Sequence, residues 1–458
     1  MNSKEIQHLY WRAGFGITPD KLDQIKKSSR KEIVGDLFTE SKYPKPLSID
    51  TSEFNNINPL TILKDKKKLR AFIKRSQELS IEYNYAWIKR IANSEDLLRE
   101  RMTLFWANHF VCKDHNIFYV QQYNNTLRKY ALGDLIEFTK AVSKQPAMLK
   151  YLNNKQNVKS NPNENFAREL MELFTLGKGN YSEKDIKESA RAFTGYFHNF
   201  KGEFMVRRLQ HDYGLKRFLG KRGRFNGDDI IDIIFSKREC AHYICEKIYS
   251  YFVNDKINQS HISEMVKVLY PKYNIGQLMR YVFMSEWFYN SENIGSKIKS
   301  PIDFLVGIHK TVPLNFRVQK QILALQRVLG QVLLDPPNVA GWTGGRTWID
   351  SNTILLRLRL PSLLLSNGLI STKKKGEFND QLAKFIDKNN GRNRFFKVDC
   401  DWKHFERQYQ NVSVENMIDH LIVSPLNSGT KTVLNNLGKA SKMEYCIQLM
   451  SIPEYQMC

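Results

Sequence analysis

Segment 164–175 carries the side chains with the clearest potential for chemistry. At the helical period its polar residues fall within one arc of about 100°, opposite an apolar face: Asn165, Arg168, Glu169 and Glu172. Carboxylates spaced in this way serve as metal ligands or as a general base, and Arg168 or Arg191 would stabilise an anion beside them. The competing interpretation is a solvated or helix-bridging ion-pair cluster with no site.

Two further segments extend these carboxylates to a candidate metal site. The predicted ligands form an oxygen and nitrogen set of the kind that iron, manganese or zinc takes: His109, Glu169, Glu172, His211 and Asp212. The Glu-x-x-His pairing of helical di-iron proteins does not occur among these candidates, which weighs against a di-iron centre. The cofactor is therefore unknown, with a divalent metal as the candidate.

Residues 207–225 form a basic, glycine-bearing stretch that predicts an anion-cradling loop. Glycines permit tight turns while Lys216, Arg222 and Arg224 supply the cations. The spacing is not that of a Walker loop, so nucleotide binding is not indicated. The whole chain carries a net charge of +23, which favours polyanionic partners such as nucleic acid, anionic glycans or an acidic protein.

A second unusual loop covers residues 335–349. It is rich in glycine, proline and tryptophan and contains Arg346, a composition suited to lining a pocket. We expect Trp342 and Arg346 to contribute to binding there. The alternative is that Trp342 and Trp348 fill the core between helices.

Helical periodicity dominates the rest of the chain. The sequence predicts a mostly α-helical protein: a single large multi-helix domain over 1–370, at most a short β-hairpin around 196–209, and a smaller helical C-terminal lobe over 371–458. The polar stretch 371–395 is the expected boundary. Helix 97–111 is apolar nearly all round, yet it carries Arg101 and His109, which therefore need partners. We expect the carboxylates of 164–175 to provide them.

Composition limits the class of protein. At 42% hydrophobic and 26% charged residues, the 458-residue chain is expected to be a soluble globular protein. No apolar run approaches the roughly 18 residues of a membrane span, and the first residues lack the apolar segment of a secretory signal. The sequence thus predicts a cytoplasmic location and no membrane span, while export through a partner stays open.

Five motifs, in one order, resemble a known family. They are the segments His8–Gly16, Glu100–Phe110, Pro162–Gly177, His211-Asp212 with Phe218-Leu-Gly, and Pro336–Ile349. Together they are similar to the bacterial family called domain of unknown function 1800, across about residues 6–360. The resemblance implies a mostly helical protein without a settled activity, commonly encoded beside a sulfatase-like exported protein. Ala107 stands where family members often carry a second histidine, which weakens any metal site needing that residue.

Two functions remain open at this point. The first is a metal- or carboxylate-dependent enzyme with a central pocket built from the 97–111 and 164–175 helices and the 207–225 and 335–349 loops; its catalytic residues would be Glu169, Glu172, Arg168 and Arg191. The alternative is a non-catalytic basic scaffold or accessory protein that binds an acidic or sulfated partner or the sulfatase-like protein. Directed polar groups in four separate segments slightly favour the enzyme.

Overall fold

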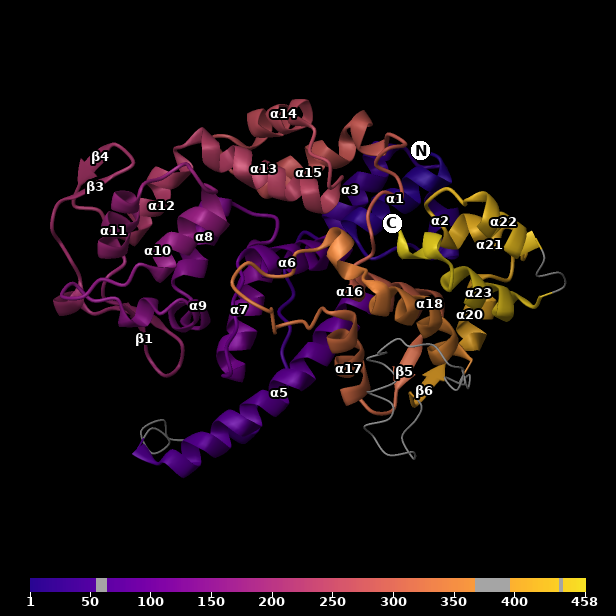
Figure 1. Ribbon diagram of the computed structural model, residues 1–458, viewed down its shortest axis with the longest axis horizontal. Helices are drawn as coiled ribbons and strands as arrows, with labels where there is room; N and C mark the ends of the chain where they lie inside the picture. Colours follow the sequence, from indigo (N-terminus) through magenta and orange to yellow (C-terminus); the bar gives the residue numbers. More distant parts are fainter. Residues whose placement is uncertain (55–63, 367–395, 436–439) are drawn as a thin grey trace.

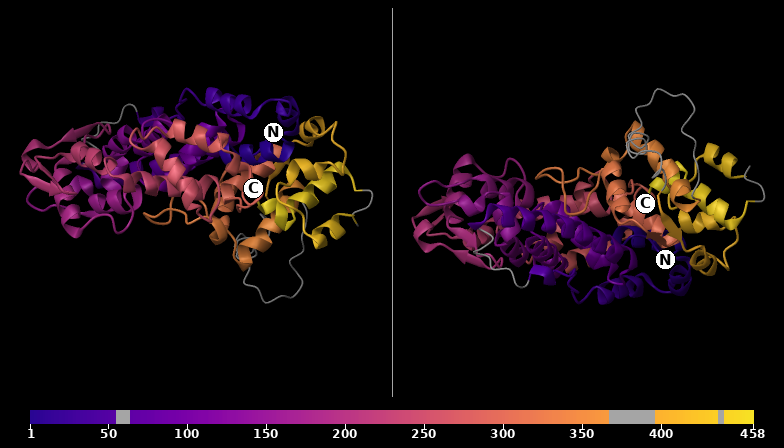
Figure 2. Two further views of the ribbon diagram at one scale, coloured as in Figure 1. Left: turned by 90° about the horizontal axis from the view of Figure 1, so that it is seen from above. Right: turned by 90° about the horizontal axis from the view of Figure 1, so that it is seen from below.

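The structure is mostly α-helical, as the sequence predicts. The computed structural model describes residues 1–54, 64–366, 396–435 and 440–458. This part of the chain is 61% helical and contains only three small two-stranded sheets. The molecule is elongated, and its C-terminal helices lie at the opposite end of the long axis from the hairpins of the middle of the chain (Figures 1 and 2).

The elements follow one another in the order labelled in Figure 1. The first half contains the helices α1 (Ser3–Ala13), α2 (Pro19–Ile25), α3 (Arg30–Glu40), α5 (Lys66–Asn93), α6 (Leu97–His109), α7 (Ile117–Tyr130), α8 (Leu135–Ser143), α9 (Pro146–Tyr151), α10 (Asn165–Glu169), the π-helix η3 (Leu170–Thr175) and α11 (Glu183–Ala192). The second half contains α12 (Gly227–Phe235), α13 (Arg238–Phe252), α14 (Gln259–Leu269), α15 (Ile275–Met284), α16 (Pro301–Thr311), α17 (Lys320–Leu329), α18 (Ser351–Leu365), α20 (Trp402–Gln408), α21 (Met417–Leu421), α22 (Ser428–Asn435) and α23 (Lys442–Met450). Short 3-10 turns are η1 (Ser52–Phe54), η2 (Asn154–Gln156), η4 (Arg208–Gln210), η5 (Glu286–Tyr289), η6 (Gly345–Trp348) and η7 (Pro453–Gln456).

The strands form three antiparallel pairs. The predicted hairpin is confirmed as β1 (Tyr196–His198) with β2 (Phe204–Val206), in a register that pairs Phe197 with Met205. The predicted basic loop contains a second hairpin, β3 (Lys216–Phe218) with β4 (Lys221–Gly223). β5 (Leu314–Phe316) pairs with β6 (Val398–Cys400), which joins two segments far apart in the sequence.

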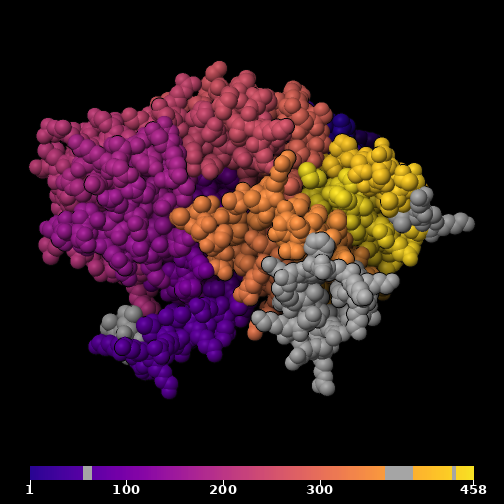
Figure 3. All heavy atoms as spheres, viewed as in Figure 1, coloured from indigo at the N-terminus to yellow at the C-terminus, as the bar shows by residue number. Residues whose placement is uncertain are grey.

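Two large apolar cores hold the helices together. One is built from side chains between Ile6 and Tyr289, and the other joins α16, α17 and α18 to residues 398–455. Figure 3 shows the magenta and yellow parts of the chain at opposite ends of the molecule, and Figure 1 shows the N-terminal helices α1 and α3 near the yellow part. The expected boundary at 371–395 lies outside the described residues, so the division into 1–370 and 371–458 stays a prediction. None of the described helices is both long and apolar enough to cross a membrane.

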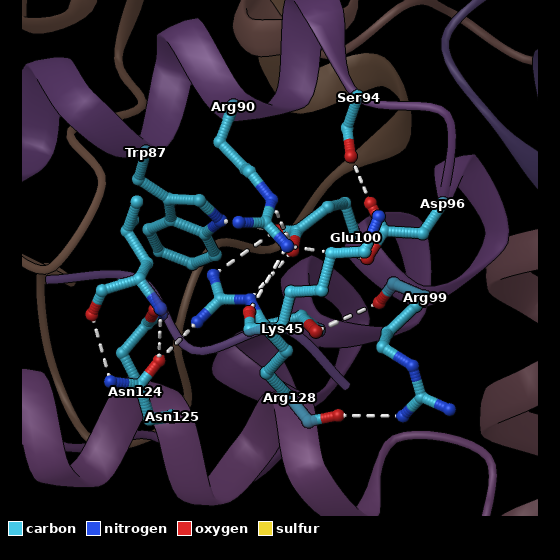
Figure 4. A network of polar contacts seen from close by, with 12 residues as sticks. Lys45, Trp87, Arg90, Ser94, Asp96, Arg99, Glu100, Asn124, Asn125 and Arg128 are labelled. Atoms are coloured by element: carbon cyan, nitrogen blue, oxygen red, sulfur yellow. Dashed lines mark hydrogen bonds and ion pairs between the residues drawn. The ribbon is translucent and has the colours of Figure 1, made fainter. Parts of the chain in front are cut away.

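Helix α6 lies between the two cores and is buried over most of its length. Phe105 and Trp106 pack in the first core, and Leu104 packs in the second. On another side Glu100, which is fully buried, accepts hydrogen bonds from Trp87 Nε1 at 3.0 Å and from Arg128 Nε at 2.6 Å (Figure 4). Burial lowers the pKa of Arg128, but the Glu100 carboxylate outweighs it and raises that pKa overall.

Candidate functional site: a cationic cavity

A cavity of about 390 Å³ lies beside α6. Its walls come from α1, α6, α13, the start of α16, and residues 339–348. Figure 1 shows the loop before α18 reaching across towards α6 and α7. Two of the four segments predicted to build a central pocket, 97–111 and 335–349, therefore line this cavity. Segment 164–175 contributes only Leu173, and segment 207–225 contributes no residue.

Positive side chains outnumber negative ones along the cavity wall. The lining cations are Arg12, Arg101, Lys247 and Lys297, and the lining carboxylates are Asp255 and Asp303. Each carboxylate is already engaged, since Asp303 pairs with Arg101 at 2.6 Å and Asp255 pairs with Lys297. The lining therefore carries more cationic than carboxylate side chains.

Asp303 is positioned by the start of α16. Ser300 is the N-cap, Pro301 occupies the first turn, and Asp303 completes a capping box by accepting from the Ser300 backbone and hydroxyl. Its other oxygen accepts from Arg101. Burial lowers the pKa of Arg101, but Asp303 raises it overall. This contact corrects the expectation that Arg101 pairs with a carboxylate of segment 164–175.

Arg12 is a buried cation of the wall that makes no ion pair within the described structure. Its side chain is buried and donates only through Nη2, to the Asn293 carbonyl at 3.0 Å and to Ser296 Oγ at 3.2 Å. Arg12 Nε has no hydrogen-bond partner, and no described carboxylate lies within ion-pair distance. Burial lowers its pKa, as expected for a guanidinium taken out of water. The guanidinium thus lacks an ion-pair partner, and its unpaired Nε atom is itself inaccessible to solvent.

More buried cations stand behind this wall. Burial lowers the pKa of Lys299 to about 7, of Lys310 to about 8 and of Arg357 to about 10. Lys299 Nζ has no hydrogen-bond partner and sits 4.0 Å from the ring centroid of Trp11 and 3.7 Å from that of Tyr455. Burial therefore disfavours the charged forms of these three side chains.

The 335–349 loop is fixed to α6 by one side chain. Asn108 Oδ1 accepts from the Trp342 backbone N–H at 2.7 Å, and Asn108 Nδ2 donates to the Trp342 carbonyl at 3.0 Å. Gly341 has a φ of +77°, and a Cβ there would collide with the Asn108 side chain, so glycine permits the close approach. Trp342 lines the cavity as expected. Arg346 is exposed and lies outside the lining, so its role in binding stays a prediction.

His109 contacts segment 164–175 in an unexpected way. That segment changes from α-helix to π-helix at Leu170, a transition often found at functional sites. His109 Nε2 donates to the Phe174 carbonyl at 2.9 Å, and Tyr243 donates to the Leu173 carbonyl at 2.9 Å. Burial lowers the pKa of His109 to about 3, so its imidazole is neutral. The two helices do meet, but through backbone carbonyls instead of carboxylates.

The two carboxylates of that segment differ in their surroundings. Glu172 accepts from Tyr181 at 3.0 Å and pairs with Lys178 at 3.2 Å. Glu169 is half-buried, and burial together with the neighbouring Glu172 raises its pKa. Arg168 pairs with Glu183 at 2.8 Å. Their assignment as catalytic residues stays a prediction, but none of them lines the cavity.

The residues predicted around His211 form a closed local network. Arg191 donates to Asp212 at 2.7 Å, and His211 Nδ1 lies 2.7 Å from the Thr194 carbonyl. Lys216 is buried, and its amine donates to the Asp212 and Gly214 carbonyls at 2.6 and 3.2 Å. It is therefore tied to its own loop, and burial lowers its pKa.

The five predicted metal ligands are not gathered by the fold. In the ranges that the structure describes, no group of three or more His, Cys, Asp or Glu side chains is placed to hold a metal ion. The reason is topological: His109 faces a π-helix carbonyl, while His211 and Asp212 bind the end of α11. We therefore derive no chemistry through a metal.

Sequence reasoning missed most of the cavity wall. Arg12 lies in the motif His8–Gly16, whose sequence is typical of a structural loop. The sequence Ser300-Pro-Ile-Asp303 predicts a capping box, but it does not indicate that Asp303 pairs with Arg101. Lys247 and Lys297 belong to ordinary amphipathic or polar stretches. No local pattern marks these residues as neighbours.

These features define a helical protein with a buried, cation-rich cavity. The sequence matches the protein family of unknown function DUF1800 over residues 8–457. This match covers nearly the whole chain, so the protein belongs to that family. No curated protein and no solved structure matches the chain.

Proposed function

We propose that this protein binds a small ligand bearing an oxyanion, such as a sulfate, phosphate or carboxylate group, in the central cavity. The observation that carries the proposal is Arg12, a buried guanidinium in the cavity lining that makes no ion pair within the described structure. A buried charge normally has a partner of opposite sign. An anionic ligand would supply it.

Hydrogen-bond donors in the wall support the same ligand chemistry. The indole N–H groups of Trp342 and Trp348 make no hydrogen bond within the described structure, and both residues line the cavity. Asp303 Oδ1 accepts from Arg101, and Asp255 Oδ1 accepts from Lys297. A wall with free donors and engaged acceptors suits an oxyanion, and aromatic side chains beside it suit a ligand with a flat apolar part.

Binding is supported better than carboxylate-dependent catalysis. A general base needs an available carboxylate near the bound ligand, and both carboxylates of the wall are engaged by cations. Glu169 and Glu172 lie outside the cavity lining. The family resemblance implies a sulfatase-like partner, and we propose that a sulfated compound is a ligand that the cavity and this partner have in common.

The test is ligand binding by the full chain and by matched variants. We expect sulfate, phosphate or 4-sulfobenzoate to raise the melting temperature above that in chloride at equal ionic strength. Saturation at a hundred times the dissociation constant corresponds to about 2.7 kcal/mol of stabilisation. Arg12→Gln and Lys247→Gln should weaken binding measured by calorimetry, whereas Arg346→Gln, at an exposed site away from the cavity, should not. An equal loss in Arg346→Gln, or no ligand-specific stabilisation, would overturn the proposal.

A further inference from the structure

Exposed apolar side chains concentrate in one short segment of the described structure. Twelve large hydrophobic residues are exposed there, and five of them fall between residues 205 and 215. Their exposed fractions are 88% for Leu209, 60% for Tyr213, 52% for Leu215, 45% for Met205 and 39% for Val206. Single exposed apolar residues are ordinary, but a cluster of this kind marks an interaction surface.

The same region is strongly basic. Residues 201–225 contain eight Lys or Arg and two acidic residues, and one of those, Asp212, is neutralised by Arg191. Arg217, Arg222 and Arg224 are exposed and make no ion pair within the described structure. We call residues 205–224 the basic tip. It combines protruding apolar groups with cations free to meet an anionic surface.

The basic tip is held in place by its own contacts. It contains hairpin β3/β4 and most of strand β2, which pairs with β1, and the Arg207 guanidinium stacks 3.3 Å from the ring centroid of Phe197 in β1. The buried Lys216 amine ties two carbonyls of the segment together. Both hairpins lie at the end of the long axis opposite the C-terminal helices (Figures 1 and 2). The exposed side chains are thus presented at an extremity of the molecule.

We propose that the basic tip docks on the surface of an anionic lipid bilayer. Aliphatic side chains would enter the interface while the arginines contact lipid phosphates, the combination that holds peripheral proteins on membranes. A second copy of the chain fits poorly, because a symmetric interface would bring the same cations together. Nucleic acid fits poorly as well, since Leu209 and Leu215 offer no ring for base stacking.

The experiment measures partition of the full chain onto vesicles. We expect binding to phosphatidylcholine vesicles containing phosphatidylserine, weaker binding at high salt, and little binding to phosphatidylcholine alone. The double variant Arg222→Gln/Arg224→Gln should lower partition roughly tenfold or more, given the contribution of each basic residue near such a surface. Leu209→Ser/Leu215→Ser should lower it as well.

Matched controls come from exposed residues elsewhere. Leu355→Ser and Arg346→Gln should leave partition unchanged, and circular dichroism should show every variant folded because the altered side chains are exposed. Equal losses in tip and control variants would overturn the proposal, as would equal binding to neutral vesicles. Absence of vesicle binding, together with binding of an acidic protein, would assign the tip to a protein partner. Arg12→Gln should retain vesicle binding, so this test is independent of the cavity.

Discussion

Two regions beside helix α6 hold buried charge, and they resolve it differently. In the network of Figure 4, Arg99 has no carboxylate partner but donates from all three nitrogens to carbonyls, including Ser41 at 2.7 Å and Arg128 at 2.8 Å. In the cavity, Arg12 is equally buried, each being 4% exposed, yet it donates from one nitrogen only. In the first region the protein itself supplies an acceptor to every nitrogen of the buried arginine, and in the second region it does not.

This difference in hydrogen bonding distinguishes a buried arginine with a structural role from one that we propose binds a ligand. A buried cation whose donors all find acceptors needs nothing further, so the Figure 4 network accounts for the packing of α6 against α5 and α7. A buried cation with an unsatisfied donor costs stability unless another molecule supplies the acceptor. Incomplete compensation is thus a better mark of a binding site here than the presence of charge.

Removing the central carboxylate of the complete network should have the largest effect. Glu100→Gln leaves Arg128 buried without its counter-charge, and we expect a loss of about 3–5 kcal/mol in the free energy of unfolding, measured in urea. The control is Glu53→Gln, which breaks the exposed pair with Arg75 and should cost at most about 1 kcal/mol. Similar losses of unfolding free energy in both variants would show that the buried network contributes no more to stability than an exposed ion pair.

The paired arginines test the comparison directly. Arg99→Gln removes several charge-assisted hydrogen bonds and should cost about 2–4 kcal/mol, whereas Arg12→Gln should cost less than about 1 kcal/mol because Arg12 is poorly satisfied without ligand. Both losses come from the same urea titration, without added sulfate or phosphate. If Arg12→Gln is as destabilising as Arg99→Gln, Arg12 is a structural residue.

Attachment of the 335–349 loop should have a smaller effect. Gly341→Ala combines positive φ with a collision against Asn108, so we expect a loss of about 1–3 kcal/mol and weaker ligand binding. Gly179→Ala is the matched control, because φ there is +89° but no atom lies near the added Cβ. Equal thermal shifts for the two variants would mean that the close approach to Asn108 contributes nothing.

The smallest expected effect concerns Glu169. Its raised pKa means that the folded state binds the proton more tightly, so the free energy of unfolding falls as pH rises from the usual value of 4.5 towards neutrality. Glu169→Gln should therefore raise the melting temperature more at pH 7 than at pH 4. Glu183→Gln should do the opposite, because Arg168 lowers the pKa of Glu183 in the folded protein. A destabilised Glu169→Gln variant at pH 7 would indicate that this carboxylate has a favourable partner.

Part of the site could be predicted from the chain. The composition of 335–349 marked Trp342 as pocket-lining, and the polar residues of 97–111 marked α6 as a buried helix needing partners. The partners themselves were predicted wrongly for Arg101, because Asp303 is 202 residues away in the sequence. The anion-binding role of Lys216, Arg222 and Arg224 stays a prediction; the two arginines are exposed on the basic tip, whereas Lys216 is buried.

The sequence by itself determined the helical architecture, the β1/β2 hairpin and the excess of positive charge, because periodicity, turn residues and composition act locally or additively. Only the tertiary structure decided which charges are neutralised. Arg12 and Arg99 are the same residue type in similar helices, and nothing in their neighbours along the chain separates them. Their difference comes from carbonyls and carboxylates that packing brings in from distant segments, and those contacts have no local pattern.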